Sequence, residues 1–276
     1  MESKEYSFFE SLSKVQGESW VRAINSSKIT CWIDNLFLIL FPEKKLSIAS
    51  IESDWNRNKL DFTAFLSEIE ALSIQPLDIT LQLYGLLPDL YLDLQKDAKA
   101  ILDTDPAANS IQEIINSYPG FTAIAIYRIA NAISKLNVPI VPRILTEYAH
   151  SKTGIDIHPK ASIGVPFVID HGTGVVIGET AIIGKNVCIY QGVTLGAMQV
   201  EKSMEEKKRH PTVEDNVIIY ANATILGGST IIGNHSIIGG NTFVTKSVNP
   251  YSFVMQSSKN TILNQIEINS INSFNI

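Results

Sequence analysis

The sequence predicts an α+β protein in which an N-terminal helical half is followed by a solenoid of hexapeptide repeats. Up to about residue 150, apolar residues recur at the spacing of an amphipathic helix, whereas from Ile157 onward aliphatic residues recur every six positions. Two interruptions of that six-residue period mark where a solenoid tends to carry its function. We therefore expect a helical domain over residues 1–150, a β-helix over residues 151–250 and a C-terminal tail over residues 251–276.

Several segments of the first half have helical character. The segment 121–134, FTAIAIYRIANAIS, contains no Gly or Pro and can present an apolar face at helical spacing. A shorter helical stretch, ILTEYAHSK, follows Pro142, and the earlier segments SFFESLSKV and ITLQLYGLL are similar. We expect helices to be broken at Pro76, Pro88 and Pro106, because proline lacks the amide hydrogen that an inner helical position needs. We interpret this half of the chain as a helical bundle that serves assembly of the protein.

The aliphatic residues of the second half form one long column. A strict spacing of six matches neither a helix nor a single strand, so each hexad is predicted to be one short strand and a turn, and stacking of the coils buries the column. Small residues usually lie four places after each aliphatic residue, and we interpret His235 and Asn241, which occupy two such places, as structural variation. The column comprises Ile157, Ile163, Ile169, Ile177, Ile183, Ile189, Leu195, Val213, Ile219, Ile225, Ile231, Ile237 and Phe243.

Both interruptions contain polar residues that could do chemistry. The step across DHGTGVV is eight instead of six, so this segment carries two extra residues. The segment GAMQVEKSMEEKKRHPT, after Leu195, is too long for a coil and is predicted to leave the solenoid as a loop. We expect its charged run, residues 201–209, to be a solvated face, and only the end of the segment, Arg209-His210-Pro211, to carry a specific role.

A carboxylate and a histidine are candidates for general-base catalysis. Asp156 and His171 are fifteen residues apart, close to the length of one coil, so they can face each other near one edge of the solenoid. A carboxylate that orients a histidine is the arrangement that deprotonates an alcohol. Zinc is the rival chemistry, because His158 and Asp170 could add ligands, but no compact HxH or CxxC spacing occurs and we expect no metal.

Composition and missing motifs exclude other classes of protein. The formal net charge of −6 over 276 residues argues against nucleic acid or an anionic membrane as the main partner. No GxxxxGK[ST] or GxGxxG phosphate cradle occurs, which argues against kinases and nicotinamide-dependent dehydrogenases. The N-terminus lacks the apolar core of a signal peptide, and Cys31 and Cys188 are too few for a disulfide framework. We expect a cytoplasmic protein.

Six motifs resemble those of the bacterial serine acetyltransferases, a family of hexapeptide-repeat acyltransferases. DPAA, GF followed by YRIAN, GIDIHP, IDHGTGVVIGET, VTLGA and KRHP occur in the order that this family shows, over about residues 100–250. The resemblance implies transfer of an acetyl group from acetyl-CoA to L-serine, giving O-acetylserine for cysteine biosynthesis. It also implies a left-handed parallel β-helix, trimers with active sites between adjacent subunits, and an N-terminal helical domain that pairs trimers.

The resemblance assigns the reacting centre and half of the serine site. His171 matches the family's general base, and Asp156 matches the acid that orients it. Asp105, on the helical half, and Asp170 match residues that bind the ammonium group of the amino acid. Two carboxylates around an ammonium group also make physical sense for a free amino acid.

The remaining assignments concern the serine carboxylate and coenzyme A. Arg209 and His210 match residues that hold the carboxylate of serine, and a guanidinium suits that task. Gly196, Ala197 and Ala221 match positions that line the acetyl and pantetheine arm. The family's glycine-rich loop after VTLG is replaced by the charged AMQVEKSMEEKK, so contacts between that loop and coenzyme A cannot be carried over.

Two alternatives stay open at this point. A hexapeptide acyltransferase with another hydroxyl acceptor, such as homoserine or a sugar, would keep the fold but should lack Asp105 and the pairing of Asp170 with Arg209. A non-catalytic trimeric scaffold would keep the hexads but has no reason to keep Asp156, His171 and His210 together. The sequence distinguishes neither a trimer from a hexamer nor an enzyme that cysteine inhibits from one that it does not.

The C-terminal tail suggests a protein partner. After Pro250 the hexads stop, and the chain ends in isoleucine, Ile276, as serine acetyltransferases commonly do. The resemblance implies that Ile276 inserts into the active site of O-acetylserine sulfhydrylase, where its carboxylate would imitate that of O-acetylserine. A disordered end, or a strand packed on the solenoid, is the simpler interpretation of the same residues.

Overall fold

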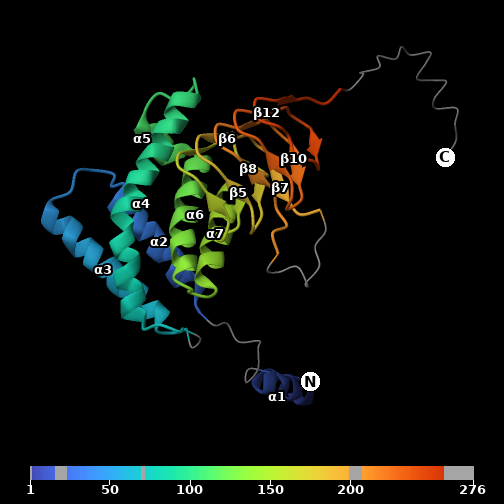
Figure 1. Ribbon diagram of the computed structural model, residues 1–276. Helices are drawn as coiled ribbons and strands as arrows, with labels where there is room; N and C mark the ends of the chain where they lie inside the picture. The colour runs from blue at the N-terminus through green and yellow to red at the C-terminus, as the bar shows by residue number, and fades with distance from the viewer. Residues whose placement is uncertain (1, 16–23, 70–71, 199–206, 258–276) are drawn as a thin grey trace, which may run out of the picture.

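The computed structural model describes residues 2–15, 24–69, 72–198 and 207–257. Helices occupy the N-terminal half of the chain and short strands follow, as the two hydrophobic periods predict. Figure 1 shows helices α2 to α7 along one flank of a regular stack of strands, with α6 and α7 nearest to the strands. The helices are α1 (Glu2–Val15), α2 (Ser26–Leu40), α3 (Ile48–Leu66), α4 (Pro76–Thr104), α5 (Ile111–Ser117), α6 (Pro119–Lys135) and α7 (Val141–Thr153).

Helix ends follow the sequence signals except at one proline. The segment predicted as a helix over 121–134 lies within α6, which begins at Pro119, where the fixed φ of proline suits the first turn. The predicted breaks at Pro76 and Pro106 are right, because α4 begins at Pro76 and ends at Thr104. The break predicted at Pro88 is wrong, since α4 continues through it. Buried leucines on both sides of Pro88 pack into the helical core, and this packing outweighs one missing backbone hydrogen bond.

The described strands form a parallel β-helix with three sheets. Sheet A contains β1, β4, β7, β10 and β13; sheet B contains β2, β5, β8 and β11; and sheet C contains β3, β6, β9, β12 and β14. The chain therefore visits each sheet once per coil, as the hexads predict, while the left-handed sense of winding stays a prediction. The strands are β1 (Asp156–Ile157), β2 (Ser162–Ile163), β3 (Phe167–Ile169), β4 (Val176–Ile177), β5 (Ile182–Ile183), β6 (Val187–Ile189), β7 (Thr194–Gly196), β8 (Thr212–Val213), β9 (Ile218–Ile219), β10 (Thr224–Leu226), β11 (Ile231–Ile232), β12 (Ile237–Ile238), β13 (Phe243–Val244) and β14 (Phe253–Val254).

The buried column follows the prediction as far as Ile225 and then shifts by one residue. Ile232 and Ile238 are fully buried, whereas the predicted Ile231 is exposed and Phe243 is 70% exposed. The reason is one extra residue in the turn after β10, where Gly227 has a φ of +103°. Ile-Ile pairs hide this shift in the sequence, because either isoleucine can serve as the inward residue.

The same shift accounts for His235 and Asn241. In the observed register the small residue of each hexad precedes the inward aliphatic residue by two places, as Ala223 precedes Ile225. The corresponding residues in the last coils are Ser236 and Thr242, both buried. His235 and Asn241 instead occupy turn positions with positive φ, so these coils keep the small-residue pattern.

A buried ion pair and a close glycine contact join the helical half to the solenoid. Arg128 on α6 donates to both carboxylate oxygens of Asp97 on α4, at 2.6 and 2.8 Å, and Asp97 also accepts the Phe167 backbone N–H of β3. A Cβ added at Gly120 would lie 2.1 Å from the carbonyl oxygen of Ile169. The start of α6 therefore lies directly on β3, the strand that leads into the DHGTG segment.

None of the described helices is both long enough and apolar enough to cross a membrane. The two cysteines, Cys31 and Cys188, are free thiols.

Candidate active site

The predicted site residues divide between two corners of the solenoid. The C–A corner, where the chain passes from sheet C into sheet A, includes residues 170–175 and 220–223. The A–B corner, where it passes from sheet A into sheet B, includes residues 178–181 and 207–211. Sheet A separates the two corners within one chain.

His171 lies on the C–A corner, in the turn that carries the two extra residues. Its φ is +57°, and Gly172 and Gly174 beside it also have positive φ, so the insertion is accommodated by left-handed backbone. The side chain of His171 is 71% exposed, and its Nδ1 lies 3.9 Å from Oδ1 of Asp170. An exposed imidazole beside a carboxylate can accept a proton from a bound molecule.

Asp105 reaches the same corner from the end of α4. Its carboxylate accepts the Tyr118 hydroxyl at 2.6 Å and the Ala107 backbone N–H at 2.8 Å. These two hydrogen bonds, Tyr118 first, lower the pKa of Asp105, and the nearby His171 lowers it further. The structure therefore brings Asp105, Asp170 and His171 together, although the first is about 65 residues from the others.

Arg209 and His210 lie on the A–B corner, against the coil that contains β4 and β5. The Arg209 guanidinium forms an ion pair with Glu179, and Lys160 bonds the other carboxylate oxygen of Glu179 at 3.0 Å. The hydroxyl of Thr180 accepts the backbone N–H groups of Arg209 and His210, at 2.9 and 3.0 Å. The end of the long loop is thereby fixed on the solenoid.

His210 is held as a neutral imidazole. Burial, followed by the positive charges of Arg209 and Lys208, lowers the pKa of His210 to about 4. Its Nδ1 accepts the Thr180 backbone N–H at 3.1 Å. In the neutral ring the proton then lies on Nε2, which makes that nitrogen a hydrogen-bond donor.

Lys208 fastens the same loop end. Its Nζ donates to the backbone carbonyls of Thr180 at 2.8 Å and of Pro211 at 3.1 Å, and also to that of His210. Partial burial lowers the pKa of Lys208. The side chain of Lys208 is exposed, as expected of the charged run, and its ammonium group also bonds three backbone carbonyl oxygens.

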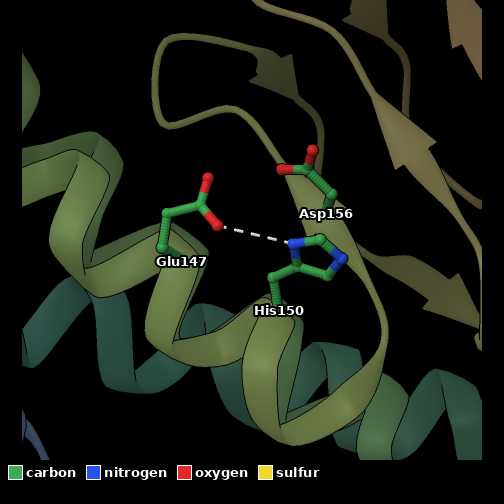
Figure 2. A group of neighbouring side chains, drawn as sticks. All are labelled: Glu147, His150 and Asp156. Atoms are coloured by element: carbon green, nitrogen blue, oxygen red, sulfur yellow. Dashed lines mark ion pairs between the residues drawn. The ribbon is translucent and has the colours of Figure 1, made fainter.

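Asp156 faces helix α7. Figure 2 shows its carboxylate beside Glu147 and His150, whose side chains project from α7, and the three possible ligand atoms lie within 4.8 Å of one another. Arg143 pairs with Glu147 and, at 3.4 Å, with Asp156. We therefore assign the cluster to ion pairing, since the guanidinium of Arg143 contacts both carboxylates. Neither a hydrogen bond nor an ion pair joins Asp156 to His171 in the described part of the chain, so the orienting role of Asp156 stays a prediction.

The residues predicted for coenzyme A are also divided between the corners. Gly196 ends β7, and Ala197 begins the loop of the A–B corner, of which residues 199–206 lie outside the described part. Ala221 lies on the C–A corner, two coils beyond His171. Its neighbour Tyr220 stacks on Tyr190 with ring centroids 5.1 Å apart, so a flat aromatic surface continues this corner along the solenoid axis.

The sequence analysis missed four residues that shape these corners: Tyr118, Glu179, Thr180 and Lys208. Glu179 and Thr180 belong to the GET segment directly after the first interruption, which was a signal for their place near the site. Lys208 lies in the KRHP motif, directly before Arg209, whereas Tyr118 carries no such signal, because its role depends on contact with a residue of another element.

Serine acetyltransferases resemble this chain in sequence and in fold, although no protein-family model matches it. A serine acetyltransferase of Synechococcus elongatus is 48% identical over 176 residues, which cover 62% of this chain and 55% of that protein. Serine acetyltransferase isoform 3 of Entamoeba histolytica, solved with cysteine, superposes with a TM-score of 0.76 at 34% identity, over 88% of this chain and 86% of that one. The chain belongs to the serine acetyltransferase family.

A further structure extends the likeness within the family. The Neisseria gonorrhoeae serine acetyltransferase solved with serine has a TM-score of 0.60 and 28% identity, over 84% of this chain and 92% of that one. The match spans about half the length of the curated serine acetyltransferases compared by sequence. The family likeness therefore covers both the helical half and the solenoid at the level of fold.

Proposed function

We propose that the chain is a serine O-acetyltransferase, which transfers the acetyl group of acetyl-CoA to the hydroxyl of L-serine and supplies O-acetylserine for cysteine biosynthesis. The observation that carries the proposal is the meeting of Asp105, Asp170 and His171 at the C–A corner. Two carboxylates suit the ammonium group of an amino acid, and an imidazole beside them suits its hydroxyl. The serine and cysteine complexes of two relatives support an amino acid of this size as the ligand.

In the proposed reaction His171 takes the hydroxyl proton of serine while the serine oxygen attacks the thioester carbonyl. The tetrahedral intermediate then collapses, the bond from carbon to sulfur breaks, and the imidazolium returns its proton to the departing thiolate of coenzyme A. Backbone N–H groups near Gly196 and Ala197 are candidates to stabilise the oxyanion. Asp156 would support the imidazolium by orienting the ring.

Arg209 and His210 would hold the carboxylate of serine. The guanidinium of Arg209 supplies the positive charge, and the neutral His210 can donate from Nε2, because its Nδ1 is engaged by Thr180. Gly196, Ala197 and Ala221 would line the acetyl and pantetheine arm of acetyl-CoA.

We further propose that each complete site forms between adjacent copies of the chain, in a homotrimer or a dimer of trimers. The support is the separation of the two corners by sheet A, since both ends of one serine must be held at once. The outward residues of that sheet suit contact between copies: Val176, Thr194 and Thr224 are short and uncharged, and Phe243 is largely exposed.

An assay of thiol release from acetyl-CoA with different acceptors tests the proposal. We expect release with L-serine, and much slower release with homoserine, with a sugar, and with 3-hydroxypropionate, which lacks the ammonium group. Faster release with homoserine or a sugar would favour a different acceptor on the same fold. If none of the acceptors gives thiol release, the result would favour the non-catalytic scaffold.

Docking to O-acetylserine sulfhydrylase stays a separate prediction, because Ile276 lies outside the described residues. Titration of the sulfhydrylase with the full chain and with a variant lacking Ile276 tests it. We expect the truncation to weaken binding, and equal affinity for both would remove the docking role while leaving the acetyltransferase proposal intact. A cytoplasmic location likewise stays a prediction.

A further inference from the structure

Tyr118 lies at the C–A corner, where the helical half of the molecule packs against the solenoid. It is the residue directly before α6, whose first turn lies on β3 through the close approach of Gly120 to the carbonyl of Ile169. Its hydroxyl donates to Oδ2 of Asp105 at 2.6 Å. The backbone N–H of Ala107 donates to the other carboxylate oxygen, so both oxygens of Asp105 have a fixed donor.

The charges of this pair are well defined. The hydrogen bond to Asp105 is the main cause that raises the pKa of Tyr118 to about 12, so the phenol keeps its proton and stays a donor. The same bond lowers the pKa of Asp105, which keeps the carboxylate charged. The negative charge of Asp170 also contributes, as the smallest cause, to the raised pKa of Tyr118.

We propose that Tyr118 is a positioning residue for the ammonium group of the acceptor. It acts through Asp105, because its hydroxyl holds the second oxygen of a carboxylate that the Ala107 N–H alone would hold at only one oxygen. This inference rests on the proposed function, in which Asp105 and Asp170 bind the ammonium group. Tyr118 itself would touch neither the hydroxyl nor the thioester, so its effect falls on serine binding and not on the chemical step.

Substitution of Tyr118 by Phe removes the hydroxyl and keeps the ring. We expect the KM for serine to rise about three- to tenfold, the range that loss of an ordinary hydrogen bond predicts, because Tyr118 acts on serine only through Asp105. The kcat and the KM for acetyl-CoA should stay within about twofold, because neither depends on the orientation of Asp105. Tyr148→Phe is the matched control, since the Tyr148 hydroxyl donates to Asp34 on α2, a carboxylate that is not part of the proposed site.

A double substitution separates positioning from a general structural effect. In an Asp105→Ala background the hydroxyl has no carboxylate to orient, so adding Tyr118→Phe should change the KM for serine no further. Equal increases in both backgrounds would overturn the inference, because Tyr118 would then act independently of Asp105. Wild-type KM values in the single variant would overturn it as well.

The proposed function and this inference fail in different ways. A wild-type protein that does not acetylate serine overturns the proposed function, and the inference with it. An active wild type whose KM for serine is unchanged in Tyr118→Phe overturns the inference alone. The melting temperature of each variant shows whether a change in KM accompanies a loss of fold.

Discussion

At the scale of single residues, hydrogen bonds, burial and nearby charges at the two corners set which groups are charged. Asp105 is kept as a carboxylate by Tyr118 and Ala107, while His210 is kept neutral by burial and by the cations beside it. His171 is exposed and lies beside Asp170, with Asp105 nearby. An exposed imidazole can exchange protons with a substrate, whereas a buried neutral imidazole can only donate or accept a hydrogen bond. We therefore expect substitutions at the two histidines to have different kinetic signatures.

Replacing His171 by Asn should lower kcat by roughly 10²- to 10⁴-fold, as loss of a general base predicts. Asn is preferred to Ala because it tolerates the positive φ of this position. His235→Asn is the control, since His235 has a φ of +56° and lies outside the proposed site. Steady-state rates with saturating serine check the prediction, and near-wild-type turnover of the His171 variant would remove the general-base role.

Replacing Arg209 by Ala should raise the KM for serine roughly tenfold or more, with little change in the KM for acetyl-CoA. The reason is the loss of a charge-assisted contact to a carboxylate, which contributes about 1.5–3 kcal/mol. Lys207→Ala removes a positive charge two residues earlier, from an exposed side chain, and should have a small effect. Should acetyl-CoA binding weaken instead, Arg209 belongs to the coenzyme A site.

At the scale of elements, close packing of adjacent coils positions the A–B corner. Lys208 and Thr180 fasten the loop end through backbone groups of neighbouring coils. The ring of His210 lies directly over Gly178, the first residue after β4. A residue of any other type at position 178 would occupy the space that the imidazole needs.

Gly178→Ala should therefore impair serine binding without preventing folding. An added Cβ would lie 2.0 Å from Cδ2 of His210, so the ring must move, and overpacking of this kind costs about 1–3 kcal/mol of unfolding free energy. The control is Gly85→Ala in α4, where no atom lies within 4 Å of the added Cβ and a gain of about 0.5–1 kcal/mol is expected. Urea unfolding and the KM for serine measure both effects. An unchanged KM in the Gly178 variant would show that His210 does not hold the substrate.

At the scale of the whole molecule, the two corners of one chain are separated by sheet A. The ammonium half of the proposed site includes Asp105, Asp170 and His171, and the carboxylate half includes Arg209 and His210. If the corners meet only between copies, two variants that each lack one half can restore a site together. Activity in a mixture is then a direct measure of shared sites.

Mixing His171→Asn with Arg209→Ala chains, by co-expression or by joint refolding, should give about a quarter of the wild-type activity. In a randomly assorted trimer with shared sites, one junction in about four joins two intact halves. Each variant assembled alone should stay at its own low activity. A mixture no more active than the average of the two variants would show that each chain holds a complete site.

The sequence by itself determined the class of fold and the motifs of the site. A period of six is a local property, and so is the eight-residue step at DHGTGVV, because both follow from how many residues one strand and one turn need. The order of helical half and solenoid, and the interruptions that carry Asp170, His171, Arg209 and His210, were predicted for the same reason.

Only the tertiary structure decided which residues meet. Ile231 and Ile232 are equally apolar, so the inward one is chosen by the coils packed above and below. Asp156 faces Arg143 on α7, and Asp105 is held by Tyr118, because the docking of helices on the solenoid brings these side chains together. These two contacts each join residues that are 13 positions apart and lie on different elements. Hydrophobic periodicity could not predict them, because it indicates only which face of each element is buried.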